Sequence, residues 1–200
     1  MRTKDLVLSA LFASFWASSQ YLLGPYLGRI SIGPISLHGS ANRIAGWFSM
    51  TVLSSITEGF GPTTLMSAVA AIATRPLRVQ QLEGIIVGLG YFVGGLTYDV
   101  LKNALLQRRD AGTRGHLFLS LASALAASAP YLLYNLYFLG PLGFTVFAPA
   151  YSISVARTTL LSIFGTSLGI LCVRSLQLIK QFAGRRGPYL QRPVKEDDLR

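Results

Sequence analysis

The chain has 200 residues, of which 51% are hydrophobic and 13% are charged, and its formal net charge is +10. Soluble domains carry about 25% charged residues, so a soluble domain of this length could not keep so much apolar surface from water. The basic residues stand in short clusters between apolar runs, which argues against nucleic-acid binding. The single cysteine, Cys172, excludes an intrachain disulfide and a paired-cysteine metal site. We therefore predict an all-α membrane protein that needs no cofactor or metal.

Six apolar runs approach the length that a bilayer span requires, which is about 20 residues and at least about 17. The predicted spans are residues 6–23, 41–57, 62–74, 83–101, 117–139 and 149–173. The third is short, because Arg75 and Pro76 stop it. Residues 1–19 have an alternative interpretation as a signal peptide, since Arg2 and Lys4 precede an apolar stretch with small residues.

The distribution of positive charge orients these spans. With the N-terminus in the cytoplasm, we assign twelve basic residues to the inside segments and four, Arg29, Arg43, Arg75 and Arg78, to the outside segments. The positive-inside rule therefore predicts a multi-pass protein of the plasma membrane with both termini cytoplasmic. Residues 1–183 form the predicted transmembrane domain, and residues 184–200 form a polar cytoplasmic tail close to anionic lipid.

The first span carries small residues on one face, because Ser9, Ala13 and Ala17 are four residues apart. Small residues let another helix approach closely, either in a partner or within the same protein. Glycine pairs in the fourth and sixth spans have the same kind of spacing, and we assign them to packing within the protein. These pairs are Gly84/Gly88, Gly90/Gly94 and Gly165/Gly169.

The helix of the first span opens, from Lys4 on, with Lys-Asp-Leu-Val-Leu-Ser-Ala-Leu-Phe-Ala and continues through Ser14-Phe15-Trp16-Ala17. With six spans and a long outer loop over residues 24–40, this layout resembles the substrate-binding S component of energy-coupling factor (ECF) transporters. Trp47 in the second span, and Glu83-Gly84 leading into a glycine-rich fourth span, are similar to the hydroxymethylpyrimidine/thiamine permease branch of that family.

The resemblance implies that this chain binds the substrate and that partner subunits supply the energy for transport. Ala13 and Ala17, with Ser9 on the same face, would dock on a transmembrane T component, and two ATPase subunits would complete the transporter. A small vitamin or precursor, such as thiamine or hydroxymethylpyrimidine, would bind near the outer surface beneath the loop after the first span. The third span departs from this branch, since Ser67 and Thr74 stand where acidic residues are expected.

Arg157 is an ionisable residue inside the sixth span, about 12 Å below its outer end. An arginine at this depth needs a carboxylate or a bound anionic or polar ligand. The outer half of the fifth span contains Tyr131, Tyr134 and Asn135, of which the first and last share a face. Aromatic rings and an amide suit a planar heterocycle. The alternative is a belt of aromatic residues at the outer membrane surface.

Other ionisable residues have structural and functional interpretations. Glu83, at the outer start of the fourth span, neutralises nearby arginines or a cationic ligand, or balances the helix dipole. His38, in the outer loop, covers the ligand or is solvated. Asp99 and Lys102 are spaced for an ion pair within one helix. Glu58 is placed to supply negative charge at the start of the third span.

Familiar catalytic patterns are missing from the sequence. No Gly-x-Ser-x-Gly, HExxH or P-loop pattern is present. We therefore expect a binding protein that is not itself an enzyme, and whose partners hydrolyse ATP. The alternative is a membrane-embedded enzyme or assembly factor without a transported ligand. A transporter subunit requires Arg157 to face an enclosed outer pocket together with the tyrosines of the fifth span.

Overall fold

The computed structural model describes residues 1–27, 30–32, 35–36, 39–74, 81–106 and 112–186. The helices are α1 (Thr3–Leu27), α2 (Ser40–Ile56), α3 (Pro62–Ala73), α4 (Gln81–Leu106) and α5 (Gly112–Arg186). Between α1 and α2, the two-residue strands β1 (Ser31–Ile32) and β2 (Ile35–Ser36) pair antiparallel. Apart from this hairpin, the described residues form an all-helical protein, as predicted.

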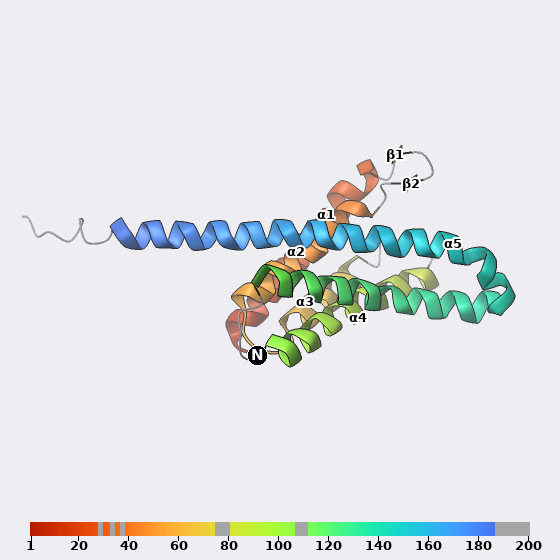
Figure 1. Ribbon diagram of the computed structural model, residues 1–200, viewed down its shortest axis with the longest axis horizontal. Coiled ribbons are helices and arrows are strands. Elements are labelled where there is room, and N and C mark those ends of the chain that lie inside the picture. Colours follow the sequence, from red (N-terminus) through yellow and green to blue (C-terminus); the bar gives the residue numbers. More distant parts are fainter. Residues whose placement is uncertain (28–29, 33–34, 37–38, 75–80, 107–111, 187–200) are drawn as a thin grey trace, which may run out of the picture.

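α5 consists of two arms that meet at Gly140 (Figure 1). Gly140 has φ 66° and ψ 174°, a conformation open to glycine because it lacks a β-carbon. Pro141 follows and begins the next helical stretch. We call residues 112–139 the first arm and residues 141–186 the second arm.

The two arms run antiparallel and contact each other between the start of the first arm and the bend. The Ser120 hydroxyl donates to the carbonyl of Ser162 at 3.2 Å. Nearer the bend, the Tyr151 hydroxyl donates to the carbonyl of Ser128 at 3.3 Å. The arms therefore contain the fifth and sixth predicted spans as a helical hairpin.

Among the described residues, three helices are long and apolar enough to cross a bilayer. They cover Thr3–Leu27, Gly84–Leu105 and Gly112–Ile179, and the last range includes both arms. By contrast, α2 has 17 residues and α3 has 12. A helix as short as α3 rises about 18 Å, which is less than the roughly 30 Å of hydrocarbon in a bilayer. The helices fit a membrane protein, while six crossings and the side of the termini stay predictions.

The helices extend further than the predicted spans at most of their ends. α1 continues to Leu27 and includes Pro25. Residues 141–148, which separate the predicted fifth and sixth spans, are helical because their apolar residues continue the second arm. Residues 184–186 of the predicted tail are also helical. The rest of that tail, residues 187–200, lies outside the described residues.

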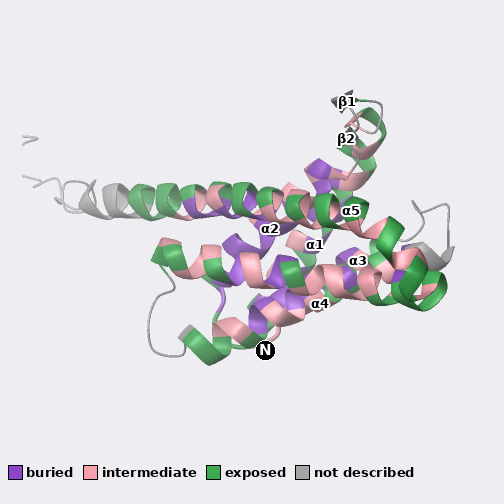
Figure 2. Ribbon diagram, turned by 45° about the vertical axis from the view of Figure 1, so that its right-hand side comes forward, coloured by how far each residue is buried: buried purple, intermediate pink, exposed green. Residues whose placement is uncertain are grey.

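Buried residues are concentrated where the helices face one another (Figure 2). Many of them are small and carry a hydroxyl group, including Ser9, Ser49, Thr63, Ser120 and Thr166. Large apolar side chains are instead exposed, including Leu11, Ile72, Leu133, Leu160 and Phe164. A soluble protein has the opposite distribution. Lipid around the bundle accounts for it, since lipid solvates apolar side chains.

Two of the three predicted glycine pairs, Gly90/Gly94 and Gly165/Gly169, lie at helix contacts. A β-carbon at Gly90 would lie 2.6 Å from the carbonyl oxygen of Ala127, and one at Gly94 would lie 3.1 Å from the Ala127 β-carbon. Gly165 and Gly169 make similarly close approaches to α2. The prediction that these two pairs serve internal packing is confirmed.

The small-residue face of α1 is buried within the chain. Ser9, Ala13 and Ala17 are 0%, 1% and 7% exposed. The Ser9 hydroxyl lies 2.7 Å from the carbonyl oxygen of Asp5 and 3.1 Å from that of Pro62, so it links α1 to the start of α3. The prediction that these residues dock on a partner is therefore wrong. The close approach that small residues permit is used inside the bundle.

Asp99 caps the N-terminus of α3 rather than pairing with Lys102. Its Oδ2 accepts hydrogen bonds from the backbone N–H of Gly61 at 3.2 Å and of Thr64 at 2.8 Å. The Thr64 hydroxyl donates to the same oxygen at 2.7 Å. Lys102 Nζ instead donates to the carbonyl of Ser54 at 2.6 Å. The first N–H groups of a helix lack partners within it, and this carboxylate supplies one from α4.

Glu58 does not supply the negative charge that we predicted for this helix start. Its side chain is 87% exposed and forms an ion pair with Arg2 at 3.6 Å. Exposed ion pairs contribute little to stability, because water screens them and both side chains lose freedom. Asp99 therefore has the role that the sequence suggested for Glu58.

Candidate functional site

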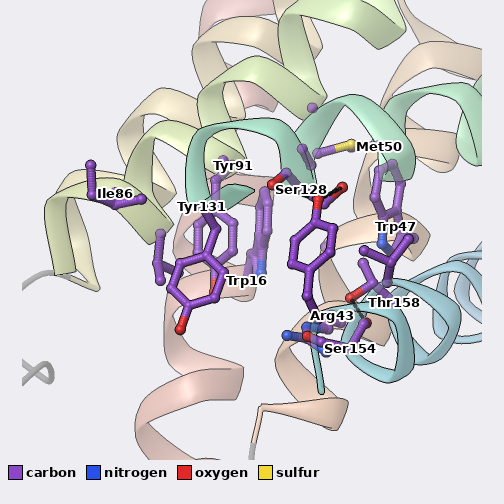
Figure 3. Close-up of a pocket in the computed structure, with 17 residues that line it drawn as sticks. Trp16, Arg43, Trp47, Met50, Ile86, Tyr91, Ser128, Tyr131, Ser154 and Thr158 are labelled. Atoms are coloured by element: carbon purple, nitrogen blue, oxygen red, sulfur yellow. Dashed lines mark hydrogen bonds between the residues drawn. The ribbon is translucent and has the colours of Figure 1, made fainter. Parts of the chain in front are cut away.

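A cavity of about 310 Å³ lies where five helical segments meet (Figure 3). Its lining comes from the middle of α1, the first halves of α2 and α4, and both arms of α5 near their bend. Gly90, Gly94 and Ala127 are among the lining residues, at the place where α4 and the first arm approach each other closely. The volume is in the range of small-molecule binding sites.

Aromatic side chains form much of the pocket wall. Figure 3 shows Trp16, Tyr91 and Tyr131 along one side of the pocket and Trp47 on the other. The rings of Trp16 and Tyr91 have centroids 5.0 Å apart and are tilted by 37°. Tyr151, from the second arm, also lines the pocket. Such walls suit a flat, partly apolar molecule, because ring faces pack against it and ring edges add polar contacts.

The position of Trp16 depends on Gly46 in α2. A β-carbon at position 46 would lie 2.5 Å from the indole ring. Real β-carbons do not approach other atoms so closely, so any larger residue there would displace Trp16. The sequence therefore keeps this indole at the pocket by means of a glycine on the neighbouring helix.

One end of the pocket carries positive charge. Arg43, near the start of α2, lines the pocket, and the charge of Arg157 acts on its guanidinium group. Arg157 Nη2 donates to the Ser40 hydroxyl at 2.5 Å. In the described part of the chain, Arg43 Nη1 is buried without a hydrogen-bond partner, and so is Trp16 Nε1. A buried donor without an acceptor costs about 1–3 kcal/mol, so an acceptor that came within reach of either group would stabilise it.

The predicted site residues have different outcomes. Tyr131 lines the pocket, whereas Arg157 is not among the lining residues and its Nη2 donates to the Ser40 hydroxyl. Asn135 does not line it, because its Nδ2 donates to the carbonyl of Tyr131 in the same helix at 2.7 Å. Tyr134 packs against another ring of its own arm, with centroids 4.5 Å apart, and is also absent from the lining.

Two predicted site residues cannot be compared with the pocket. Glu83 belongs to the first turn of α4, but its side chain lies outside the described residues. His38 lies outside them as well, so the predicted cover over the ligand stays a prediction.

Sequence reasoning missed several residues that line the pocket. Arg43 was counted as a charge of the outer loop, although it falls inside the predicted span 41–57. That depth was the signal that could have identified it, by the same argument that identified Arg157. Trp16 and Tyr91 gave no such signal, because aromatic residues are common in apolar helices.

Within the described residues, no three histidine, cysteine or acidic side chains gather as metal ligands would. The fold and the pocket thus define an all-helical protein with long apolar helices that fit a membrane, and with a small-molecule cavity between them. Comparisons of the chain with family models, curated proteins and solved structures each gave no match.

Proposed function

We propose that this chain is the substrate-binding subunit of an ECF-type transporter in the plasma membrane. It takes up a small water-soluble vitamin or vitamin precursor, and the resemblance points to thiamine or hydroxymethylpyrimidine. The chain crosses the bilayer six times with both termini in the cytoplasm. A transmembrane T component and two ATPase subunits supply the energy, and the chain itself catalyses no reaction.

The observation that carries this proposal is that the pocket lies toward the side of the membrane that the distribution of basic residues predicts to be outside. Most of the lining residues belong to the parts of α2, α4 and the two arms that the positive-inside rule assigns to the outer half of the bilayer, and the rest lie close to its middle. A subunit that takes its substrate from outside needs its site in that half. An aromatic, small-molecule-sized cavity there is what such a subunit would use.

The partner module must contact a surface other than the buried face of α1. Ser9, Ala13 and Ala17 are occupied by contacts within the chain. The proposal predicts that the protein co-purifies with a T component and two ATPases when all four are expressed together. Failure to form this complex, with a ligand still bound, would leave a membrane binding protein outside this transporter class.

Filling the pocket is expected to abolish ligand binding without unfolding the protein. Ser154 lines the pocket on the second arm, so the variant Ser154→Phe places a ring in the space that the ligand needs. We expect at least a tenfold loss of small molecule retained by the purified protein, measured by mass spectrometry of the released compounds.

The matched control is Ser152→Phe on the same arm. Ser152 is exposed and donates to the carbonyl of its own helix, so the added ring points away from the pocket. This variant should retain ligand as the unmodified protein does. The binding proposal fails if the unmodified protein retains no small molecule, or if Ser154→Phe retains as much.

A further inference from the structure

We infer that the ligand carries an anionic group, a carboxylate or a phosphate, that binds Arg43 while an aromatic body lies along Trp16 and Tyr91. The inference rests on the proposed function and specifies the chemical class of the substrate, which would then be neither thiamine, a cation, nor hydroxymethylpyrimidine, a neutral molecule. It follows from the charge at one end of the pocket, from the unpaired donors there and from the aromatic walls.

The first step concerns charge. Arg43 lies in the first turn of α2, where the helix dipole already places partial positive charge. The second cation, Arg157, is close enough to act on it. Cations inside an apolar bundle are costly unless an anion compensates them. A protein that concentrates positive charge in this way gains stability when a negative group enters the pocket.

The second step asks whether the chain supplies that anion itself. The carboxylates whose side chains the structure describes are committed elsewhere. Asp99 caps α3, Glu58 pairs with Arg2, and Asp5 accepts a hydrogen bond from the backbone N–H of Arg2. Glu83 is the acidic residue at the same end of the bundle as Arg43, and its side chain lies outside the described residues, so the experiment must include it.

The third step concerns hydrogen bonds. Arg43 Nη1 and Trp16 Nε1 are buried donors of pocket-lining residues, and neither has an acceptor in the described part of the chain. A carboxylate or phosphate offers acceptors only, and its hydrogen bonds to a guanidinium are about twice as strong as neutral ones. A cationic ligand such as free thiamine would be repelled by both arginines. The pocket therefore favours an anionic aromatic compound over a cationic one.

The first test identifies the compound that the protein retains and asks whether Arg43 holds it. Mass spectrometry should find an aromatic compound that is anionic at neutral pH. The variant Arg43→Gln should lose at least tenfold of it, which corresponds to about 1.4 kcal/mol. The control Arg174→Gln removes an arginine of the second arm that bonds Thr113 away from the pocket, and it should retain the compound.

The outcomes separate this inference from the proposed function. A neutral or cationic retained compound overturns the inference and leaves the proposed function. Retention of no compound overturns both. A phospholipid retained in place of a soluble compound also overturns the inference, because the anion would then belong to the membrane.

A second test uses defined probes and the two tryptophans of the chain, Trp16 and Trp47, which both line the pocket and report on its occupancy by fluorescence. Nicotinate and 4-aminobenzoate are each titrated against the corresponding neutral amide. Each acid should change the tryptophan fluorescence at a concentration at least tenfold below that needed for its amide. In Arg43→Gln, the concentrations at which each acid and its amide change the fluorescence should agree within about twofold. The substitution removes the preference for the charged acid, which is worth about 1.4 kcal/mol.

Glu83→Gln decides whether that residue is the missing anion. If it is not, the preference for acids over amides persists or increases in this variant. The inference is overturned if the unmodified protein shows no preference and Glu83→Gln acquires one, since the chain would then neutralise Arg43 itself. It is also overturned if neither acid changes the fluorescence of the unmodified protein.

Discussion

Asp99→Leu is expected to lower the free energy of unfolding by about 3 kcal/mol, because leucine leaves buried donors at the start of α3 without an acceptor. Asp99 is 2% exposed, and its Oδ2 receives three hydrogen bonds from Gly61 and Thr64. The negative charge also faces the positive end of the α3 dipole. Unfolding of the purified protein in mixed micelles with increasing denaturing detergent measures the change.

Asp99→Asn separates hydrogen bonding from charge. Its side-chain oxygen can still accept from Thr64, so we expect a loss of about 1 kcal/mol, which is smaller than for leucine. Glu58→Gln is the control, since that carboxylate is exposed and should leave the unfolding midpoint unchanged. If Asp99→Leu unfolds at the same detergent concentration as the unmodified protein, the carboxylate does not stabilise α3.

Gly165→Leu is expected to disrupt the contact between α2 and the second arm. A β-carbon at this position would lie 2.6 Å from the carbonyl oxygen of Ile44 and 3.0 Å from the β-carbon of Trp47. Backbone atoms cannot move aside without separating the helices, and overpacking of this kind costs about 1–3 kcal/mol or more. Trp47 lines the pocket, so ligand retention should fall together with the unfolding midpoint.

Ser167→Leu is the matched control for this substitution. Ser167 lies two residues further along the same arm, and its hydroxyl bonds the carbonyl of Ile163 at an exposed position. The added side chain would face lipid, so stability and ligand retention should both be preserved. Equal behaviour of Gly165→Leu and Ser167→Leu would contradict the close packing of the second arm on α2.

The positions of the apolar helices and both ends of α3 were readable from the sequence. α3 begins at Pro62, as predicted, because proline fits the first helical turn, and it ends at Ala73, just before the predicted stop at Arg75 and Pro76. The apolar runs of α1, α4 and the two arms were found because length and hydropathy are local properties. Internal packing at Gly90/Gly94 and Gly165/Gly169 was also correct, since small residues at helical spacing permit close approach.

The partners of individual polar residues were not readable in this way. Asp99 was paired with Lys102 because the two are close along one helix, whereas the structure brings the start of α3 to the carboxylate. Asn135 shares a helical face with Tyr131, but its amide bonds the backbone of its own helix instead of facing the pocket. Spacing along one helix tells which residues share a face, and leaves open what that face meets.

The sequence by itself determined that the chain is helical and that its helices are apolar enough for a bilayer. It also determined that the basic residues are distributed unevenly among the segments between the apolar runs. These properties follow from composition and periodicity, which need no knowledge of neighbouring helices. Only the tertiary structure decided that the small-residue face of α1 is internal and that Arg43 shares a pocket with Trp16 and Tyr91. Those features depend on how each helix is rotated against the others, and that rotation is set by contacts between residues far apart in the chain.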